Sequence, residues 1–203
     1  MWIRGYQFGS MSPLSYSAVL LAAGRSTRMG EDKALLTVGD LPLWRRQWAV
    51  LARAGVGEIL LSARPDQKWV PDKIRVVCDA KSDAGPMAGI TAALAWTKHS
   101  HLLVLAVDLP TMEAAWFAEL MKLCAPGVGA VGRQTGFFEP LAAIYPRELL
   151  GAAEAALSIG DYSLQHFITS AGAAMRHREI SKGESLWFEN WNEPGDNLTT
   201  NEH

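Results

Sequence analysis

Short apolar runs alternate with segments of helical periodicity along the first 125 residues, and this alternation limits the folds open to the chain. Continuous apolar runs are typical of strands that are buried on both faces, as in parallel sheets. The pattern predicts a single α/β domain with a mostly parallel sheet covered by crossover helices. The expected strands are 18–21, 58–62, 74–78 and 102–107, and the expected helices are 44–54, 89–97, 114–123, 148–157 and 164–171.

Length and composition are consistent with one domain. The 203 residues are 49% hydrophobic, which is enough for one substantial core. We expect this domain to cover residues 16–203, preceded by a flexible N-terminal extension at residues 1–15. From residue 125 onwards, glycines interrupt the short apolar runs until residues 141–145, and this stretch is expected to form a looser lobe of the same domain.

Charge and hydropathy exclude several classes of partner. A formal net charge of -2 argues against a broad nucleic-acid-binding surface, which carries a basic excess. No apolar stretch is long enough to span a membrane, and residues 1–16 lack the apolar centre of a signal peptide. We therefore expect a cytoplasmic protein. Cys78 and Cys124 lack metal-ligand spacing and are expected to be buried thiols.

A glycine-punctuated loop with three cations follows the first apolar run. Gly24 and Gly30 can adopt a positive φ or let a ligand approach the backbone, and successive loop amides can form an anion-binding concavity. Arg25, Arg28 and Lys33 add full positive charge, and this combination fits a triphosphate with a leaving pyrophosphate. The alternative is an ordinary surface turn with solvated arginines.

The glycine spacing does not match two common phosphate-binding loops. In the P-loop, four residues separate the glycines and a lysine follows, whereas Gly24 and Gly30 are one residue further apart and Glu31 follows. The dinucleotide fingerprint needs closely spaced glycines after the first strand, and Gly24 is alone there. Neither a P-loop enzyme nor a nicotinamide enzyme is expected.

Polar side chains and the loop fall at the carboxyl ends of the expected strands. Leu21, Ser62, Asp79 and Asp108 are all predicted at this edge, where ligands collect in open α/β sheets. Asp108 follows the strand at 102–107, and its carboxylate suits Mg²⁺ together with phosphate oxygens. Two alternatives stay open: Asp108 caps the helix that begins near Glu113, and Asp79 merely ends its strand at a turn.

The loop and five later motifs together resemble the molybdenum cofactor nucleotidyltransferases, and most closely the guanylyltransferase branch. The motifs stand in order between residues 18 and 198. They are Leu21-Ala22-Ala23-Gly24 with Arg28-Met29-Gly30 and Asp32-Lys33, then Asp79 with Gly85-Pro86-Met87-Ala88-Gly89-Ile90, Val107-Asp108-Leu109-Pro110, Glu139-Pro140-Leu141, Ser163-Leu164 and Asn190-Trp191-Asn192.

The resemblance implies a Rossmann-like, three-layer nucleotidyltransferase fold. It also implies Mg²⁺-dependent transfer of a nucleotide from GTP to molybdopterin, with release of pyrophosphate, and transient contact with molybdoenzymes or other cofactor-biosynthesis proteins. The residues implied to bind the nucleotide are Leu21, Ala22, Ala23, Gly24, Lys33, Ser62, Asp79 and Asp108. The residues implied to act in catalysis are Arg28, Lys33 and Asp108, of which Asp108 binds the metal.

Other functions remain open at this stage. Ala23 stands where guanylyltransferases usually have glycine and is similar to the cytidylyltransferase branch, so CTP is the alternative nucleotide. A non-catalytic carrier of a nucleotide or cofactor, and a nucleotidylyltransferase acting on a sugar phosphate or polyol phosphate, are also compatible with the loop. Lys33 can be a solvated charge, and Asn190 and Asn192 can cap a helix instead of holding the acceptor. Four tryptophans fall on expected helices and are predicted to pack in the core: Trp44, Trp48, Trp96 and Trp116.

Overall fold

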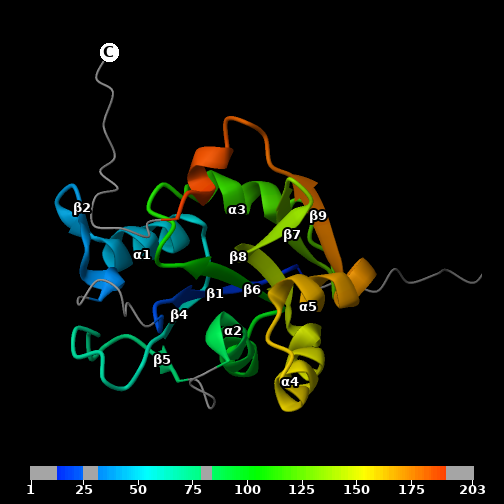
Figure 1. Ribbon diagram of the computed structural model, residues 1–203, viewed down its shortest axis with the longest axis horizontal. Coiled ribbons are helices and arrows are strands. Elements are labelled where there is room, and N and C mark those ends of the chain that lie inside the picture. The colour runs from blue at the N-terminus through cyan, green and yellow to red at the C-terminus, as the bar shows by residue number, and fades with distance from the viewer. Residues whose placement is uncertain (1–12, 25–31, 79–83, 191–203) are drawn as a thin grey trace, which may run out of the picture.

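A seven-stranded sheet forms the centre of the computed structural model, which describes residues 13–24, 32–78 and 84–190 (Figure 1). The strand order is β5-β4-β1-β6-β8-β7-β9. All pairings are parallel except those of β8, which runs antiparallel to β6 and β7. The strands are β1 (Tyr16–Leu21), β4 (Glu58–Ser62), β5 (Val76–Val77), β6 (His101–Ala106), β7 (Gly129–Gln134), β8 (Phe137–Pro146) and β9 (Met175–Glu179).

Helices cover both faces of the sheet and give three layers. In Figure 1, α1 and α3 lie above the sheet, and α2, α4 and α5 lie below it. The helices are α1 (Leu43–Arg53), α2 (Gly85–Trp96), α3 (Ala114–Met121), α4 (Leu150–Ile159) and α5 (Leu164–Ala171). Smaller elements are the hairpin of β2 (Thr37–Val38) and β3 (Leu41–Pro42) and the 3₁₀ turns Lys33–Leu35, Arg147–Leu149, Gly172–Ala174 and Ser185–Phe188.

Two apolar clusters, one on each face, hold the layers together. Alternate side chains of β6 point to opposite faces, so Leu103 belongs to the cluster beneath α1 and α3, whereas Val104 belongs to the cluster beneath α2, α4 and α5. Trp116 of α3 is completely buried, and its Nε1 donates a hydrogen bond to the backbone oxygen of Ala142 in β8, 2.8 Å away. This bond satisfies the one polar atom of the indole inside the core.

The expected α/β architecture is confirmed, and every expected strand and helix is present: the bounds of β4 and α5 are as predicted, and the ends of the others are shifted by a few residues. The largest shift is in α2, which begins at Gly85 instead of Gly89. Pro86 occupies its first turn, where backbone N–H groups have no partner within the helix, so the missing N–H of proline costs no hydrogen bond. The stretch after residue 125, which was expected to be a lobe of the same domain, contains β7, β8 and β9, and these strands extend the same sheet. The glycines there allow close packing: a Cβ on Gly129 would lie 2.1 Å from the backbone oxygen of Ile144.

Two predictions about burial are wrong. Cys78 is exposed just after β5, because that strand is only two residues long and stops at Val77. Trp96 is 55% exposed at the last turn of α2, where the guanidinium of Arg75 lies 5.6 Å from its ring centroid. Cys124 is half-buried as a free thiol, and burial raises its pKa to about 12. Within the part of the chain that the structure describes, no helix is long and apolar enough to cross a membrane.

Replacing Gly129 by alanine is expected to destabilise the fold. The new Cβ would collide with the backbone of β8, and overpacking of this kind lowers the free energy of unfolding by about 1–3 kcal/mol. Gly151→Ala is the matched control, because Gly151 lies in α4 with no atom within 4 Å of an added Cβ. There, alanine should raise the free energy of unfolding by up to about 1 kcal/mol. Urea denaturation measures both, and equal stability of the two variants would contradict the close β7–β8 contact.

Candidate functional site

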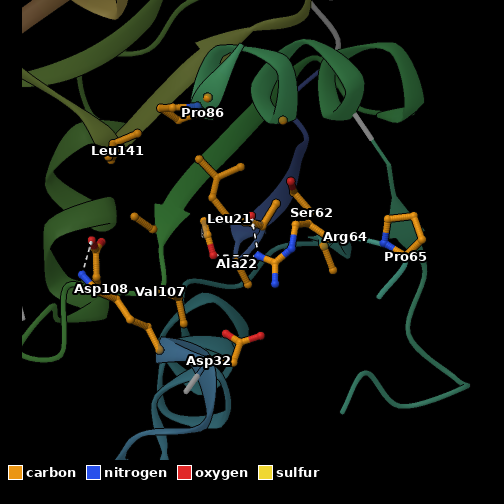
Figure 2. A pocket seen from close by; sticks show the side chains of 17 residues that line it. Leu21, Ala22, Asp32, Ser62, Arg64, Pro65, Pro86, Val107, Asp108 and Leu141 are labelled. Atoms are coloured by element: carbon orange, nitrogen blue, oxygen red, sulfur yellow. Dashed lines mark hydrogen bonds and ion pairs between the residues drawn. The ribbon is translucent and has the colours of Figure 1, made fainter. Parts of the chain in front are cut away.

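The strand order reverses between β1 and β6, and a cavity lies at this point. The chain adds β4 and β5 on one side of β1 and β6 on the other, so the loops that leave β1 and β6 diverge at the carboxyl edge of the sheet. A cavity of about 350 Å³ opens there (Figure 2). Its walls include Leu21 at the end of β1, Ser62 at the end of β4 and Asp108 just after β6. Its size falls within the usual range for small-molecule sites.

The N-terminus of α2 forms another wall of the cavity. Gly85, Pro86 and Gly89 line it, and the residue at the N-cap, Ala84, makes no side-chain hydrogen bond to the first turn of the helix. A Cβ on Gly89 would lie 2.8 Å from Ser62 Oγ and 3.0 Å from Leu21 Cδ2, so the absence of a side chain lets the helix approach the sheet closely. Uncapped amides and the positive end of the helix dipole favour an anion at this wall.

Lys33 and Asp108 face one another in the cavity. Lys33 Nζ lies 4.0 Å from Asp108 Oδ2, and both side chains are largely buried. Asp108 Oδ1 is buried, and no group within the described ranges donates a hydrogen bond to it. Burial raises the pKa of Asp108 above its usual value, and the charge of Lys33 opposes that shift without cancelling it. The carboxylate is therefore poorly solvated and lacks a partner on one oxygen.

The protein oxygens at this cavity can bind a hard cation such as Mg²⁺ only together with oxygens from a bound molecule. No group of three or more His, Cys, Asp or Glu side chains that could enclose a metal exists among residues 13–24, 32–78 and 84–190. Asp108 supplies one carboxylate with an unpaired oxygen. Mg²⁺ commonly binds through one or two carboxylates, substrate phosphates and water, so Asp108 fits this ion together with a polyphosphate.

Most of the predicted site residues meet at this cavity. Those that line it are Leu21, Ala22, Ala23, Gly24, Lys33, Ser62 and Asp108. Arg28 and Asp79 lie outside the described residues. The alternative in which Asp108 caps a helix receives no support, because the N-cap of α3 is Glu113, whose side chain makes no capping hydrogen bond.

The connection after β4 contributes residues that the sequence pattern did not reveal. Arg64 and Pro65 line the cavity, and Arg64 Nη1 donates to the backbone oxygens of Ala23 at 2.8 Å and Gly24 at 2.7 Å. The only sequence signal for Arg64 and Pro65 was their position after a strand that ends at the ligand-binding edge. Asp32, which belongs to the first sequence motif together with Lys33, also lines the cavity.

A MobA-like NTP transferase domain model matches residues 18–178. The chain belongs to the MobA-like NTP transferase family. A protein of Opitutus terrae named as a probable molybdenum cofactor guanylyltransferase is 40% identical over 192 residues, which cover 92% of this chain and 95% of that protein. A molybdenum cofactor guanylyltransferase of Pseudomonas putida is 33% identical over 152 residues, covering 73% and 80% of the two chains.

The fold of this MobA-like chain also matches a solved structure. The molybdopterin-guanine dinucleotide biosynthesis protein A of Archaeoglobus fulgidus superposes with a TM-score of 0.71 at 18% identity, over 88% of this chain and 93% of that one. The predicted three-layer nucleotidyltransferase fold is therefore confirmed. The resemblance to the guanylyltransferases that the sequence motifs indicated is confirmed as well, and the chain is a nucleotidyltransferase.

Asp108→Asn is expected to raise thermal stability at neutral pH. Because the folded pKa of Asp108 is raised, its protonated form stabilises the fold below the unfolded pKa, and this contribution is lost as the pH rises through the folded pKa. The side-chain amide of asparagine does not titrate. The variant should therefore have a higher Tm than the unsubstituted protein, and the difference in Tm should grow as the pH rises. Calorimetry from pH 4 to pH 8 measures this, with exposed Asp72→Asn as control. A Tm difference independent of pH would contradict the raised pKa.

Proposed function

We propose that this nucleotidyltransferase transfers a guanylyl group from GTP to molybdopterin in the presence of Mg²⁺. The Lys33–Asp108 pair carries the proposal, because it sets Lys33 Nζ 4.0 Å from Asp108 Oδ2 in the cavity at the strand-order reversal, while the other oxygen of this carboxylate, Oδ1, has no hydrogen-bond partner among the described residues. Transfer from a nucleoside triphosphate requires both features. The names of the relatives from Opitutus terrae and Pseudomonas putida support molybdenum cofactor as the acceptor and guanine as the base.

The reaction is an in-line displacement at the α-phosphorus of GTP. A phosphate oxygen of molybdopterin attacks that phosphorus, and the bond to the oxygen that bridges the α- and β-phosphorus breaks. Pyrophosphate leaves with the electron pair of that bond, and the guanine dinucleotide form of the cofactor results. The attacking phosphate is already an anion, so no strong general base is needed, and alignment and charge neutralisation supply the catalysis.

Different residues of the cavity align the triphosphate and neutralise its charge, according to the chemistry of their polar groups. Lys33 neutralises the triphosphate as a point charge, and the loop amides of residues 21–24 and the first turn of α2 bind phosphate oxygens. Asp108 holds Mg²⁺, which when bound neutralises phosphate charge and orients the triphosphate. We assign Arg28 to charge stabilisation at the transferred phosphate and Asp79 to the nucleotide, as the sequence motifs imply.

Pyrophosphate release across nucleotides and acceptors tests the reaction and its specificity. With molybdopterin and Mg²⁺, GTP is expected to support release in step with formation of the dinucleotide, while ATP, UTP and CTP support far less. Preference for CTP would assign the chain to the cytidylyl reaction that Ala23 leaves open. Pyrophosphate release with a sugar phosphate or polyol phosphate but not with molybdopterin would refute molybdopterin as the acceptor. Binding of GTP without pyrophosphate release would indicate a carrier.

Asp108→Asn and Lys33→Met are each expected to lower kcat/KM by about 100- to 1,000-fold, because each removes a charge that is positioned for the transition state. Excess Mg²⁺ should not restore Asp108→Asn. Lys122→Met is the matched control for the lysine, because Lys122 is an exposed residue at the C-cap of α3, does not line the cavity, and pairs with Glu119 at 2.6 Å. Near-normal turnover in Asp108→Asn would refute the role of this carboxylate in metal binding.

A further inference from the structure

The connection between β4 and β5 holds both ends of the loop that follows β1. At the first end, Arg64 Nη1 bonds to the backbone oxygens of Ala23 and Gly24, and Arg64 Nε bonds to Asp66 Oδ1 at 3.1 Å. In Figure 2 the guanidinium of Arg64 reaches across to the strand end near Ala22. The start of the loop is thus bonded to side chains about 40 residues further along the chain.

Gln67 joins the two ends directly. Its Nε2 donates to the backbone oxygen of Ala22 at 2.9 Å and to Asp32 Oδ2 at 2.6 Å, and its Oε1 accepts a hydrogen bond from the backbone amide of Arg64 at 2.6 Å. The side chain is only 7% exposed. Both donor hydrogens and the acceptor of this buried amide are therefore used, and two of its bonds fix residues on opposite sides of the loop.

The far end of the loop is held by further bonds to Asp32. Trp69 Nε1 donates to Asp32 Oδ2 at 2.8 Å, and the backbone amide of Ala34 donates to Asp32 Oδ1 at 3.1 Å. Asp32 directly precedes Lys33, whose Nζ faces Asp108. Any shift of the Asp32 carboxylate would therefore move the backbone that carries the lysine of the site.

We propose that Gln67 is a positioning residue for the nucleotide loop, the loop that follows β1: by linking Ala22 to Asp32 it fixes the two described ends of that loop, residues 21–24 and Asp32. The proposal rests on the proposed function, since it assigns that loop to the triphosphate. Gln67 is not among the residues that line the cavity, whereas Arg64 is, so Gln67 acts through the loop and not by contact with the nucleotide. Without its amide, Ala22 O and Asp32 Oδ2 would each lose a buried donor.

Gln67→Met tests this role because methionine fills a similar volume without hydrogen-bonding groups. The KM for GTP is expected to rise by about tenfold, which corresponds to about 1.4 kcal/mol of binding free energy. The KM for molybdopterin should change less than about twofold, because the change is local to the nucleotide loop. Hydrogen exchange at residues 21–24 and 32–36 should also become faster, while exchange in β6 stays unchanged.

Gln165→Met is the matched control, since Gln165 also bonds through both amide groups, to the backbone N and O of Phe138 at 2.9 and 2.7 Å. It should leave the KM for GTP and the exchange at residues 21–24 unchanged. If Gln67→Met does not fold, Trp69→Phe removes one bond to Asp32 and decides the question by the same measurements.

Each result distinguishes this role from the proposed reaction. If hydrogen exchange at the loop ends and the KM for GTP are both unchanged in Gln67→Met, the positioning role is refuted. A lower kcat with both KM values unchanged also refutes it, because that result indicates a general loss of folded protein. Faster exchange at the loop ends, in a protein whose unsubstituted form releases no pyrophosphate from GTP and molybdopterin, would support the positioning role and refute the proposed reaction.

Discussion

The parallel pairing of β1 with both β4 and β6 is the constraint on which the rest of the molecule depends. Because the three strands run in the same direction, their carboxyl ends meet at one edge, and residues more than 80 positions apart come to line one cavity. The reversal of strand order at β1 separates the loops that leave this edge. The close approach of α2 at Gly89 then closes the cavity from one face of the sheet.

Asp108 illustrates how stability and function conflict at this edge of the sheet. Its carboxylate lies in a site where burial disfavours the charged form, and one oxygen has no donor among the described residues. A protein selected for stability alone would have a neutral or apolar side chain there. The arrangement is useful only when a cation and a polyphosphate complete the shell of this carboxylate, so the unfavourable burial is consistent with a ligand-binding role.

The sequence predicts one half of the molecule better than the other, for a physical reason. Strands buried on both faces have continuous apolar runs, so β1, β4 and β6 were predictable, as was the meeting of Leu21, Ser62 and Asp108 at one edge. The hairpin of β7 and β8 was not, because Gly129 and Gly132 resemble strand breakers until the close contacts they permit are known. Gln67 bonds to a backbone oxygen, a backbone amide and the carboxylate of Asp32. Backbone groups are the same in every residue, and Asp32 is 35 positions away, so no residue pattern reveals these partners.

The link between Ala22 and Asp32 also affects the entropy of ligand binding. Bringing the two ends of a chain segment together costs conformational entropy, and a ligand that had to close the segment itself would lose that amount of affinity. Here the two ends, at Ala22 and Asp32, are held together by the protein's own Gln67 side chain. Folding has therefore already met the entropic cost of closing the loop, and more of the contact energy with a nucleotide is available as affinity.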